Sequence, residues 1–219
     1  MIVLGSRARG YSGGNALPEE IERAVRQLWE DRAFDRAATR AIEAYGGEIA
    51  RFLASRFTSA ADAQDVFATF CEDLWAGLPG FAWRCTLRGW AYTLARHAEL
   101  RLKMSAAHRR TRLDTVPDAE LRARGRTTTA PYVRTDVKDR FRAIRSRLTE
   151  EDQTILVLRV DRDLGWRDIA HVLAGPGGLT LADDPQREEA RIRKRFQIIK
   201  EKLRQWAADD GLLPARESA

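Results

Sequence analysis

Apolar side chains recur at helical spacing through most of this chain, and this pattern restricts its fold more than any other feature. After Pro18, for example, Ile21, Val25 and Leu28 follow one another at intervals of four and three residues. Side chains with this spacing lie on one face of an α-helix, where they can be buried together. Strand-like alternation never lasts more than a few residues, and the chain has only seven prolines. The sequence therefore predicts an all-α fold.

Local signals indicate where several helices begin and end. Thr58 or Ser59 can cap the helix that follows them, because a hydroxyl oxygen there accepts a hydrogen bond from a free backbone N–H. Thr149 with Asp152 resembles a capping box. The pair at 46–47, Gly-Gly, is expected to break or kink the long helical run that starts near residue 18.

Helical periodicity is lost in the middle of the chain, where two prolines, a glycine and three consecutive threonines occur together. Such a composition is typical of a linker. We therefore expect two helical domains joined by a flexible linker. The expected division is a disordered tail (1–17), a first domain (18–110), the linker (111–137), a second domain (138–212) and a short tail (213–219).

The charge balance and the cysteines restrict the partners and the compartment. Lys and Arg number 38 against 32 Asp and Glu, which gives a net charge of +6. This excess suits a polyanion such as nucleic acid, but a basic protein without such a partner would show it too. Cys71 and Cys85 have neither metal-ligand nor redox spacing, so we expect buried free thiols and a cytoplasmic location. No apolar run is long enough to span a membrane, so no membrane partner is expected.

Catalytic and metal-binding signatures are weak in this sequence. The three histidines, His97, His108 and His171, have no partners at the spacing of a metal site or a catalytic triad. No glycine-rich phosphate loop and no nucleophile elbow is found. The sequence therefore predicts a protein that is not an enzyme and that holds no cofactor and no metal.

The last helical segment is strongly basic. Between Arg187 and Trp206 the chain has eight Lys or Arg and three Glu. Apolar residues at intervals of four, three and four residues would pack inward: Ile192, Phe196, Ile199 and Leu203. The basic side chains that project elsewhere are then candidates for DNA contact: Arg187, Arg191, Arg193, Lys194 and Arg195. A basic helix with an apolar back can enter a major groove about 12 Å wide, although a basic surface helix without a ligand has the same pattern.

Two further stretches have unusual composition. The segment from residue 77 to 97 interleaves aromatic residues with arginines, a combination that can stack unpaired bases while holding phosphates. Trp90 fits the buried stripe of a helix there, so core packing explains it at least as well. The other stretch is an acidic helix face formed by Asp62, Asp65, Glu72 and Asp73. This face would repel DNA, so it is either a solvated surface or a docking surface for a basic protein.

In their order along the chain, these segments resemble a bacterial σ70-family RNA polymerase sigma factor of the extracytoplasmic-function (ECF) type. Residues 44–81 resemble the family's first conserved region, and residues 86–100 resemble the segment that opens and reads the −10 element. Residues 148–174 and 190–204 resemble the two parts of the helix-turn-helix domain that reads the −35 element. The resemblance is specific because two independent sets of motifs occur in the right order around a linker.

The resemblance implies a σ2-like first domain, a σ4-like second domain and a function in transcription initiation. The partners would be core RNA polymerase, at its β′ clamp and β flap, and promoter DNA, with an anti-sigma factor as a further candidate. The acidic face would bind the polymerase, and the basic last helix would read the −35 element. The −10 contacts would come from Phe81, Trp83, Arg84, Arg88, Tyr92, Arg96 and His97. The alternative is a helix-turn-helix DNA-binding regulator, or a repurposed σ homologue, that does not programme polymerase.

The connection inside this helix-turn-helix is unusually long. Such motifs normally join their helices by a turn of about three or four residues, whereas sixteen residues separate Leu173 from Ala190. Asp184 is a good N-cap and Pro185 a good first helical residue. We therefore expect the basic helix to start near Pro185 and the insertion proper to cover residues 175–183.

Overall fold

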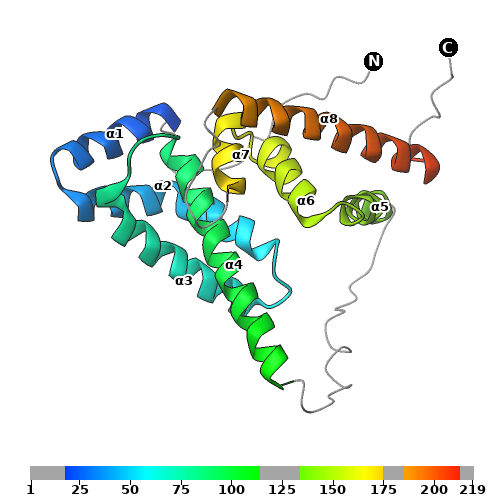
Figure 1. Cartoon of the computed structure of the whole chain (residues 1–219), viewed down its shortest axis with the longest axis horizontal. Coiled ribbons are helices and arrows are strands. Elements are labelled where there is room, and N and C mark those ends of the chain that lie inside the picture. The colour runs from blue at the N-terminus through cyan, green and yellow to red at the C-terminus, as the bar shows by residue number, and fades with distance from the viewer. Residues whose placement is uncertain (1–17, 114–133, 175–184, 213–219) are drawn as a thin grey trace.

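The computed structural model describes residues 18–113, 134–174 and 185–212. Within these ranges the chain is helical and has no strand, which confirms the predicted all-α class (Figure 1). The expected tails and residues 114–133 of the expected linker lie outside the described residues. The helices are α1 (Pro18–Glu30), α2 (Phe34–Ala54), α3 (Ala60–Gly77), α4 (Leu87–Leu113), α5 (Arg134–Ser146), α6 (Glu150–Leu156), α7 (Trp166–Leu173) and α8 (Pro185–Asp209).

Helices α1 to α4 form what we call the N-terminal half. α2, α3 and α4 pack against one another, and α1 lies on α2 (Figure 1). The apolar stripe of α3 is buried at Val66, Phe70 and Leu74. Ser59, rather than Thr58, is the cap of α3, because its side chain accepts a hydrogen bond from the backbone N–H of Asp62. The local cap signal therefore located the start of this helix correctly.

The first helical run is interrupted at a different place from the one expected. α1 ends at Glu30, and Arg32 has a φ of 57°, in the left-handed region. α2 then continues through both glycines to Ala54, so the prediction that these glycines break the helix is wrong. A Cβ on Gly46 would lie 3.3 Å from a methyl carbon of Ile42 and 3.6 Å from the ring of Phe67. The missing side chain lets α3 approach α2 closely, and the helix continues because this packing holds it.

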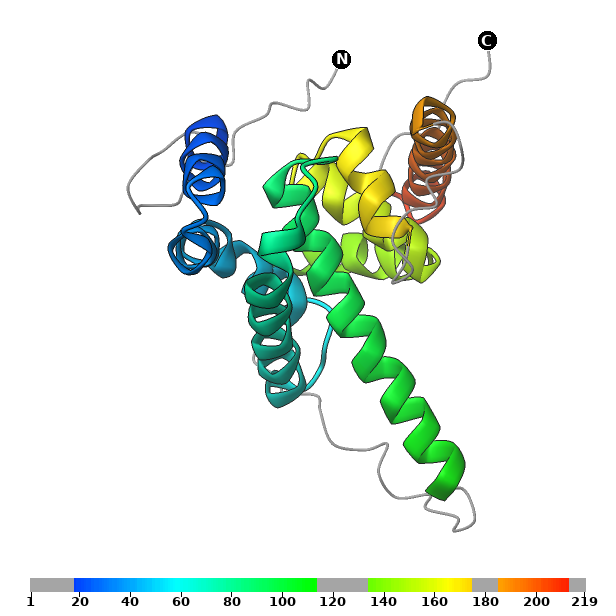
Figure 2. The same cartoon turned by 60° about the vertical axis from the view of Figure 1, so that its left-hand side comes forward.

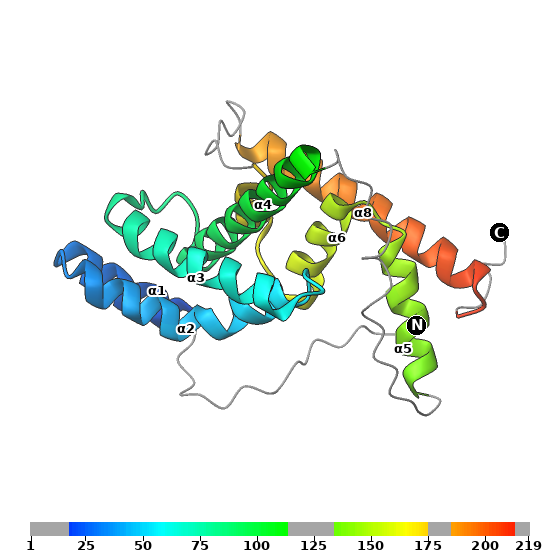
Figure 3. The ribbon, with the colours of Figure 1, turned by 90° about the horizontal axis from the view of Figure 1, so that it is seen from below.

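Helices α5 to α8 form the C-terminal half. Thr149 caps α6 by accepting a hydrogen bond from the N–H of Asp152, as predicted. A π-helical turn (Val157–Asp161) follows α6 and leads to α7. α8 packs on α5, α6 and α7, and Figure 3 shows α5 lying beside it. α8 begins at Pro185, which confirms the predicted start, whereas Asp184 and the expected insertion at 175–183 lie outside the described residues.

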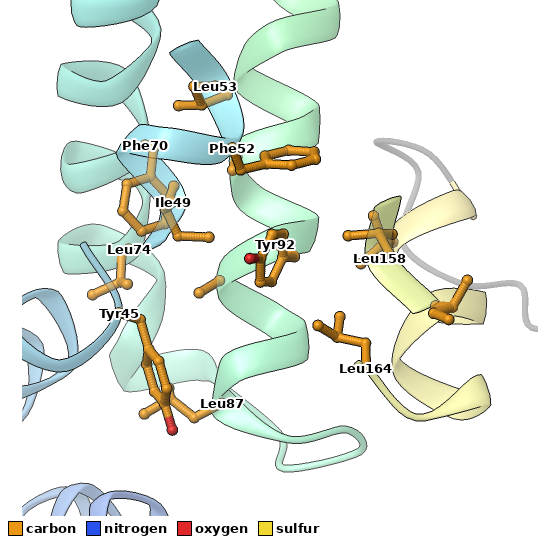
Figure 4. Close-up of a cluster of buried hydrophobic side chains, with 14 of the residues drawn as sticks. Tyr45, Ile49, Phe52, Leu53, Phe70, Leu74, Leu87, Tyr92, Leu158 and Leu164 are labelled. Carbon is orange, nitrogen blue, oxygen red and sulfur yellow. The ribbon is translucent and has the colours of Figure 1, made fainter. Parts of the chain in front are cut away.

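The two halves share one hydrophobic core that passes across α4. α4 packs on α2 and α3 on one side and on α7 on the other, and its far end extends beyond the other helices (Figure 2). Figure 4 shows Tyr92 of α4 between the side chains of α2, such as Phe52, and Leu158 and Leu164 of the C-terminal half. The division into two domains joined by a linker stays a prediction. In the described residues the halves are in direct contact, along a junction that we call the seam.

Candidate nucleic-acid interface

The acidic face of α3 is mostly open to solvent. Asp62, Asp65 and Glu72 are exposed, whereas Asp73 is half-buried and forms an ion pair with Arg101 of α4. α3 carries four acidic residues and no Lys or Arg. The face therefore has a negative charge that nothing else on α3 offsets, and it is available for a basic partner.

An aromatic side chain extends this face. Trp75 is 44% exposed, and its indole N–H donates to a carboxylate oxygen of Asp35 on α2, at 3.1 Å. Large exposed aromatic side chains are enriched where proteins dock on one another. α3 thus combines negative charge with an anchoring aromatic group.

The basic helix α8 places its apolar stripe as predicted. Ile192, Phe196 and Ile199 are buried, and Leu203 packs against the core from a partly buried position. The candidate DNA-contacting residues lie on other faces of the helix, and most are exposed: Arg187, Arg191, Arg193 and Lys194, with Arg195 half-buried.

Three of these arginines have acidic neighbours. Arg191 forms a bidentate ion pair with Glu188, with a shortest N–O distance of 2.5 Å. This pair lowers the pKa of Glu188. Arg193 pairs with Glu189 at 3.2 Å. Both pairs lie on the surface of α8, so they exchange easily for contacts with a phosphate.

Arg195 is held differently from the other basic residues of α8. Its Nε lies 2.6 Å from the carboxylate of Asp152, which is buried, and its Nη1 lies 2.7 Å from that of Glu151. These two carboxylates belong to the first turn of α6. Arg195 therefore fixes α8 on α6, and its position serves the fold of the C-terminal half.

The aromatic residues of the 77–97 segment pack on one another. Phe81 is buried and stacks on Trp90 with ring centroids 4.6 Å apart, and it also contacts Trp83 at 4.8 Å. Trp83 meets the edge of Trp29 from α1, and the guanidinium of Arg26 lies 5.3 Å above its ring. Trp83 is half-buried. This aromatic cluster joins α1 to the start of α4.

Two other candidate −10 residues form a buried polar network. The phenol of Tyr92 is fully buried and donates to Glu48 at 2.6 Å, and burial raises its pKa. The guanidinium of Arg88 donates to the same carboxylate at 2.5 Å and to the backbone carbonyl of Arg162 at 2.7 Å. Burial alone would lower the pKa of Arg88, but its bonds to Glu48 outweigh this and raise it. Arg88 therefore links α2 and α4 to the C-terminal half.

Arg96 lies in a second cluster at the seam, around a carboxylate that is fully buried. Glu99 accepts hydrogen bonds from Arg56 at 2.6 Å, and it pairs with Lys103 at 2.7 Å and with Arg96 at 3.5 Å. Glu150 of α6 joins this cluster through Lys103 at 2.5 Å and Arg56 at 3.0 Å. Burial lowers the pKa of Arg96, since it disfavours the charged form. The cluster connects the N-terminal half to the start of α6.

The first turn of α4 is capped by both halves. Thr86 accepts a hydrogen bond from the N–H of Gly89 at 2.9 Å, and Glu22 of α1 accepts from the N–H groups of Leu87 and Arg88 at 2.9 and 3.1 Å. Asp168 of α7 accepts from the N–H and hydroxyl of Thr86 at 3.1 and 2.8 Å. The backbone N–H groups at the start of α4 have no partner within the helix, and these carboxylates and the hydroxyl of Thr86 accept their hydrogen bonds.

The structure thus places the candidate −10 residues in very different surroundings. Arg84 is exposed and His97 half-buried, whereas Phe81, Tyr92 and Arg96 are buried. The sequence reasoning missed the acidic residues that hold this region together: Glu22, Glu48, Glu99 and Asp168. Glu99 has a local signal, since Arg96 and Lys103 lie three and four residues away on α4. Glu22, Glu48 and Asp168 have no such signal, because their partners lie on other elements. Thr86 also has a local signature, since a threonine directly before a helix is a common cap.

The two cysteines are free, but neither is fully buried as expected. Both are half-buried and pack against the hydrophobic core. Burial raises the pKa of Cys71, and it raises that of Cys85 to about 12. Both thiols are therefore poor nucleophiles at neutral pH.

Metal-binding and membrane-spanning features are absent from the part of the chain that the structure describes. There, no group of three or more His, Cys, Asp or Glu side chains is arranged to hold a metal ion. None of the described helices is long and apolar enough to cross a membrane. Comparison of the sequence with protein-family models gives no match, and no curated protein shows significant similarity to it.

Proposed function

We propose that this chain is an ECF-like sigma factor, which binds core RNA polymerase, recognises the −10 and −35 promoter elements and promotes DNA melting. The observation that carries the proposal is the separation of opposite charges onto two helices. α3 has four acidic residues and no basic ones, whereas α8 has eight Lys or Arg and four Asp or Glu. This separation occurs in the helix order that the resemblance implies, and such a factor would act in the bacterial cytoplasm.

The polymerase would be bound through α3. Asp62, Asp65 and Glu72 are exposed on one helix, and Trp75 provides an aromatic anchor next to them. A docking surface of this kind fits a basic coiled coil such as the β′ clamp, because complementary charge steers the encounter and the aromatic group is desolvated on contact.

The −35 element would be read by the first turns of α8. Lys194 is exposed and has no ion pair within the described residues, and the surface pairs of Arg191 and Arg193 can exchange for phosphates or guanine edges. Arg195 would not contact DNA. It would contribute to recognition by keeping α8 in position on α6.

Recognition of the −10 element would require the seam to open. Arg84 is already exposed, but Arg88, Tyr92 and Arg96 lie within the contacts between α4, α2 and the C-terminal half. In the proposed mechanism, polymerase binding separates the halves and exposes α4 to the unpaired strand. Flipping a base costs a few kcal/mol, which stacking and pocket contacts offset.

Purified core polymerase and the full chain test this proposal. The promoter is first identified by mapping transcript starts after overexpression, and the chain should then support initiation there with core polymerase. The triple variant Asp62→Lys, Asp65→Lys and Glu72→Lys should lose polymerase binding while keeping its circular dichroism spectrum. A matched control reverses three exposed acids elsewhere, at Glu30, Asp31 and Glu43, and should bind normally.

Two results would overturn the proposal. One is unchanged polymerase affinity in the α3 variant. The other is tight promoter binding without polymerase and without any effect on initiation, which would establish the alternative of a DNA-binding regulator. On the DNA side, replacement of Arg191 and Lys194 by alanine should weaken −35-dependent initiation and reduce its salt dependence.

A further inference from the structure

A cavity opens at the seam, beside the start of α4. Its volume is about 450 Å³, within the usual range for sites that bind small molecules. The N-terminal half contributes Arg23 and Arg26 from α1 and the segment around Trp83 and Arg84, and the C-terminal half contributes Arg167 of α7. We call this cavity the seam cleft. Because both halves form its walls, it exists only while they are in contact.

The seam cleft carries an excess of positive charge. Four arginines line it, against two carboxylates, those of Glu22 and Asp168. Both carboxylates are already bound to the first turn of α4 and to Thr86, so they are directed toward the helix start. Among the arginines, Arg26 pairs with Glu30 at 3.2 Å and Arg23 donates to the backbone carbonyl of Glu19 at 3.3 Å, so the positive charge that stays open to a ligand is that of Arg84 and Arg167.

Arg84 and Arg167 are not held in this way. Arg84 and Arg167 are exposed, and among the described residues no carboxylate lies within ion-pair distance of either. In this they differ from Arg191, Arg193 and Arg195 of α8, which all have carboxylate partners. Two arginines without a carboxylate partner that line one cavity are suited to an anion with several oxygens, above all a phosphate, which arginine can bind with two parallel hydrogen bonds.

Trp83, which lines the seam cleft, has an unusual backbone conformation. Its φ is 54°, in the left-handed region that bulky side chains rarely adopt. Its indole Nε1 is buried and donates no hydrogen bond. Strained residues of this kind persist only where their surroundings hold them, and they gather at ligand sites. Trp83 therefore places a strained residue, held by its packing on Phe81 and Trp29, at the wall of the cavity.

We propose that the seam cleft binds a phosphorylated small molecule of nucleotide size. The phosphate lies between Arg84 and Arg167, and the organic part lies along Trp83 and Cys85. This site is separate from the proposed function, because its ligand is a free small molecule and its binding needs neither polymerase nor promoter.

Binding in the cleft also affects the arrangement of the halves. A ligand that contacts both walls binds the closed arrangement better than any open one, so it shifts the population toward the closed arrangement. It also occupies Arg84, which is the exposed member of the candidate −10 set. The ligand would therefore oppose any activity that requires the seam to open.

Calorimetric titration of the full chain at low salt tests the site directly, with ADP, GDP, pyrophosphate and adenosine as probes. We expect a nucleotide to bind, pyrophosphate to bind more weakly and adenosine to show no binding. The double variant Arg84→Gln and Arg167→Gln should lower the affinity about tenfold or more, because charge-assisted hydrogen bonds are lost. The control Arg140→Gln and Arg204→Gln alters exposed arginines outside the cleft and should bind as the unaltered chain does.

Several results would overturn the proposal. The first is that no phosphorylated probe binds at millimolar concentration. The second is that the control variant loses as much affinity as the double variant, which would indicate binding to general surface charge. A short single-stranded oligonucleotide is titrated in parallel. If it binds more tightly than the nucleotides and shows the same dependence on Arg84 and Arg167, the cleft takes a nucleic-acid strand and the free-ligand proposal fails.

A further variant tests the link between the cleft and the seam. Gly89 does not line the cleft, but a side chain there would displace Asp168 of α7. Gly89→Ala should therefore lower nucleotide affinity, and Gly47→Ala, in the middle of α2, should leave it unchanged. Unaltered affinity in Gly89→Ala would contradict a site shared by the two halves.

Discussion

A single added methyl group at residue 89 tests the seam. A Cβ on Gly89 would lie 2.6 Å from both Cγ and Oδ1 of Asp168, and 2.7 Å from its Cβ. Asp168 cannot turn away without losing its hydrogen bonds to Thr86. Because two of these atoms are close to the α7 backbone, the methyl group should displace the helix as a whole. We therefore expect Gly89→Ala to loosen the contact between α4 and α7.

Two opposing effects set the size of the change. Replacing glycine by alanine inside a helix stabilises it by about 0.5–1 kcal/mol, since alanine has less backbone freedom to lose. Forcing an extra methyl group into a packed site costs about 1–3 kcal/mol. The second effect is larger here, because the contact distances lie well below normal van der Waals separation. The expected result is a net decrease of about 0.5–2 kcal/mol in the free energy of unfolding.

Urea denaturation of the full chain, followed by circular dichroism, measures this change. Gly47→Ala is the matched control, because residue 47 is exposed and its Cβ would meet only Arg51, at 3.8 Å. That variant should gain about 0.5–1 kcal/mol. In an Asp168→Gly background, which removes the three closest atoms, Gly89→Ala should become stabilising. If Gly89→Ala stabilises the unaltered chain as much as Gly47→Ala does, α7 does not pack on α4 in this way.

Three further predictions concern other parts of the structure. Glu99→Gln should lower the free energy of unfolding by about 3–5 kcal/mol, because it leaves the guanidinium of Arg56 without its buried partner; a change within about 0.5 kcal/mol would contradict the buried cluster. Thr149→Ala should cost about 1 kcal/mol through loss of the α6 cap, and Thr149→Ser should restore it; equal stability of the two variants in urea would rule out the cap. Burial lowers the pKa of His171, so the unfolded chain binds its proton more readily and stability should fall as the pH drops below about 6.5. His171→Gln should lose less stability between pH 7 and 5.5, and an identical pH dependence in both proteins would refute this.

The features that sequence reasoning predicted correctly depend on neighbours along the chain. The cap at Thr149, the cap at Ser59 and the start of α8 at Pro185 all follow from residues within one helical turn. The inward stripe of α8 follows from periodicity in the same way. The break expected at the glycines 46 and 47 does not occur, because a contact with α3 decides the outcome, and Phe67 lies far from them in sequence.

The candidate site was harder to predict, because residue type does not reveal whether a side chain faces a ligand or another helix. Arginines among aromatics suggested contacts to bases and phosphates, yet Arg88 and Tyr92 bind Glu48 within the protein. A carboxylate and a phosphate attract a guanidinium in the same way. Thr86 and Asp168 are 82 residues apart, so no local pattern could bring them together.

The chemistry of the seam bears on the proposed function. Leu158 and Leu164 contribute apolar contacts across it, but the contacts made by Asp168, Glu150 and the carbonyl of Arg162 are polar. Groups that form polar contacts can bond to water when two surfaces separate, so a mixed interface opens at a lower cost than an apolar one of equal area. A partner that binds both α3 and α8, and whose own structure holds the two binding sites at a fixed distance, would offset this cost with its binding free energy. A ligand in the seam cleft would be held by one arginine from each half, so it would add bonds across the seam. Because the seam opens at a low cost, these added bonds would shift the population toward the closed arrangement by a measurable amount.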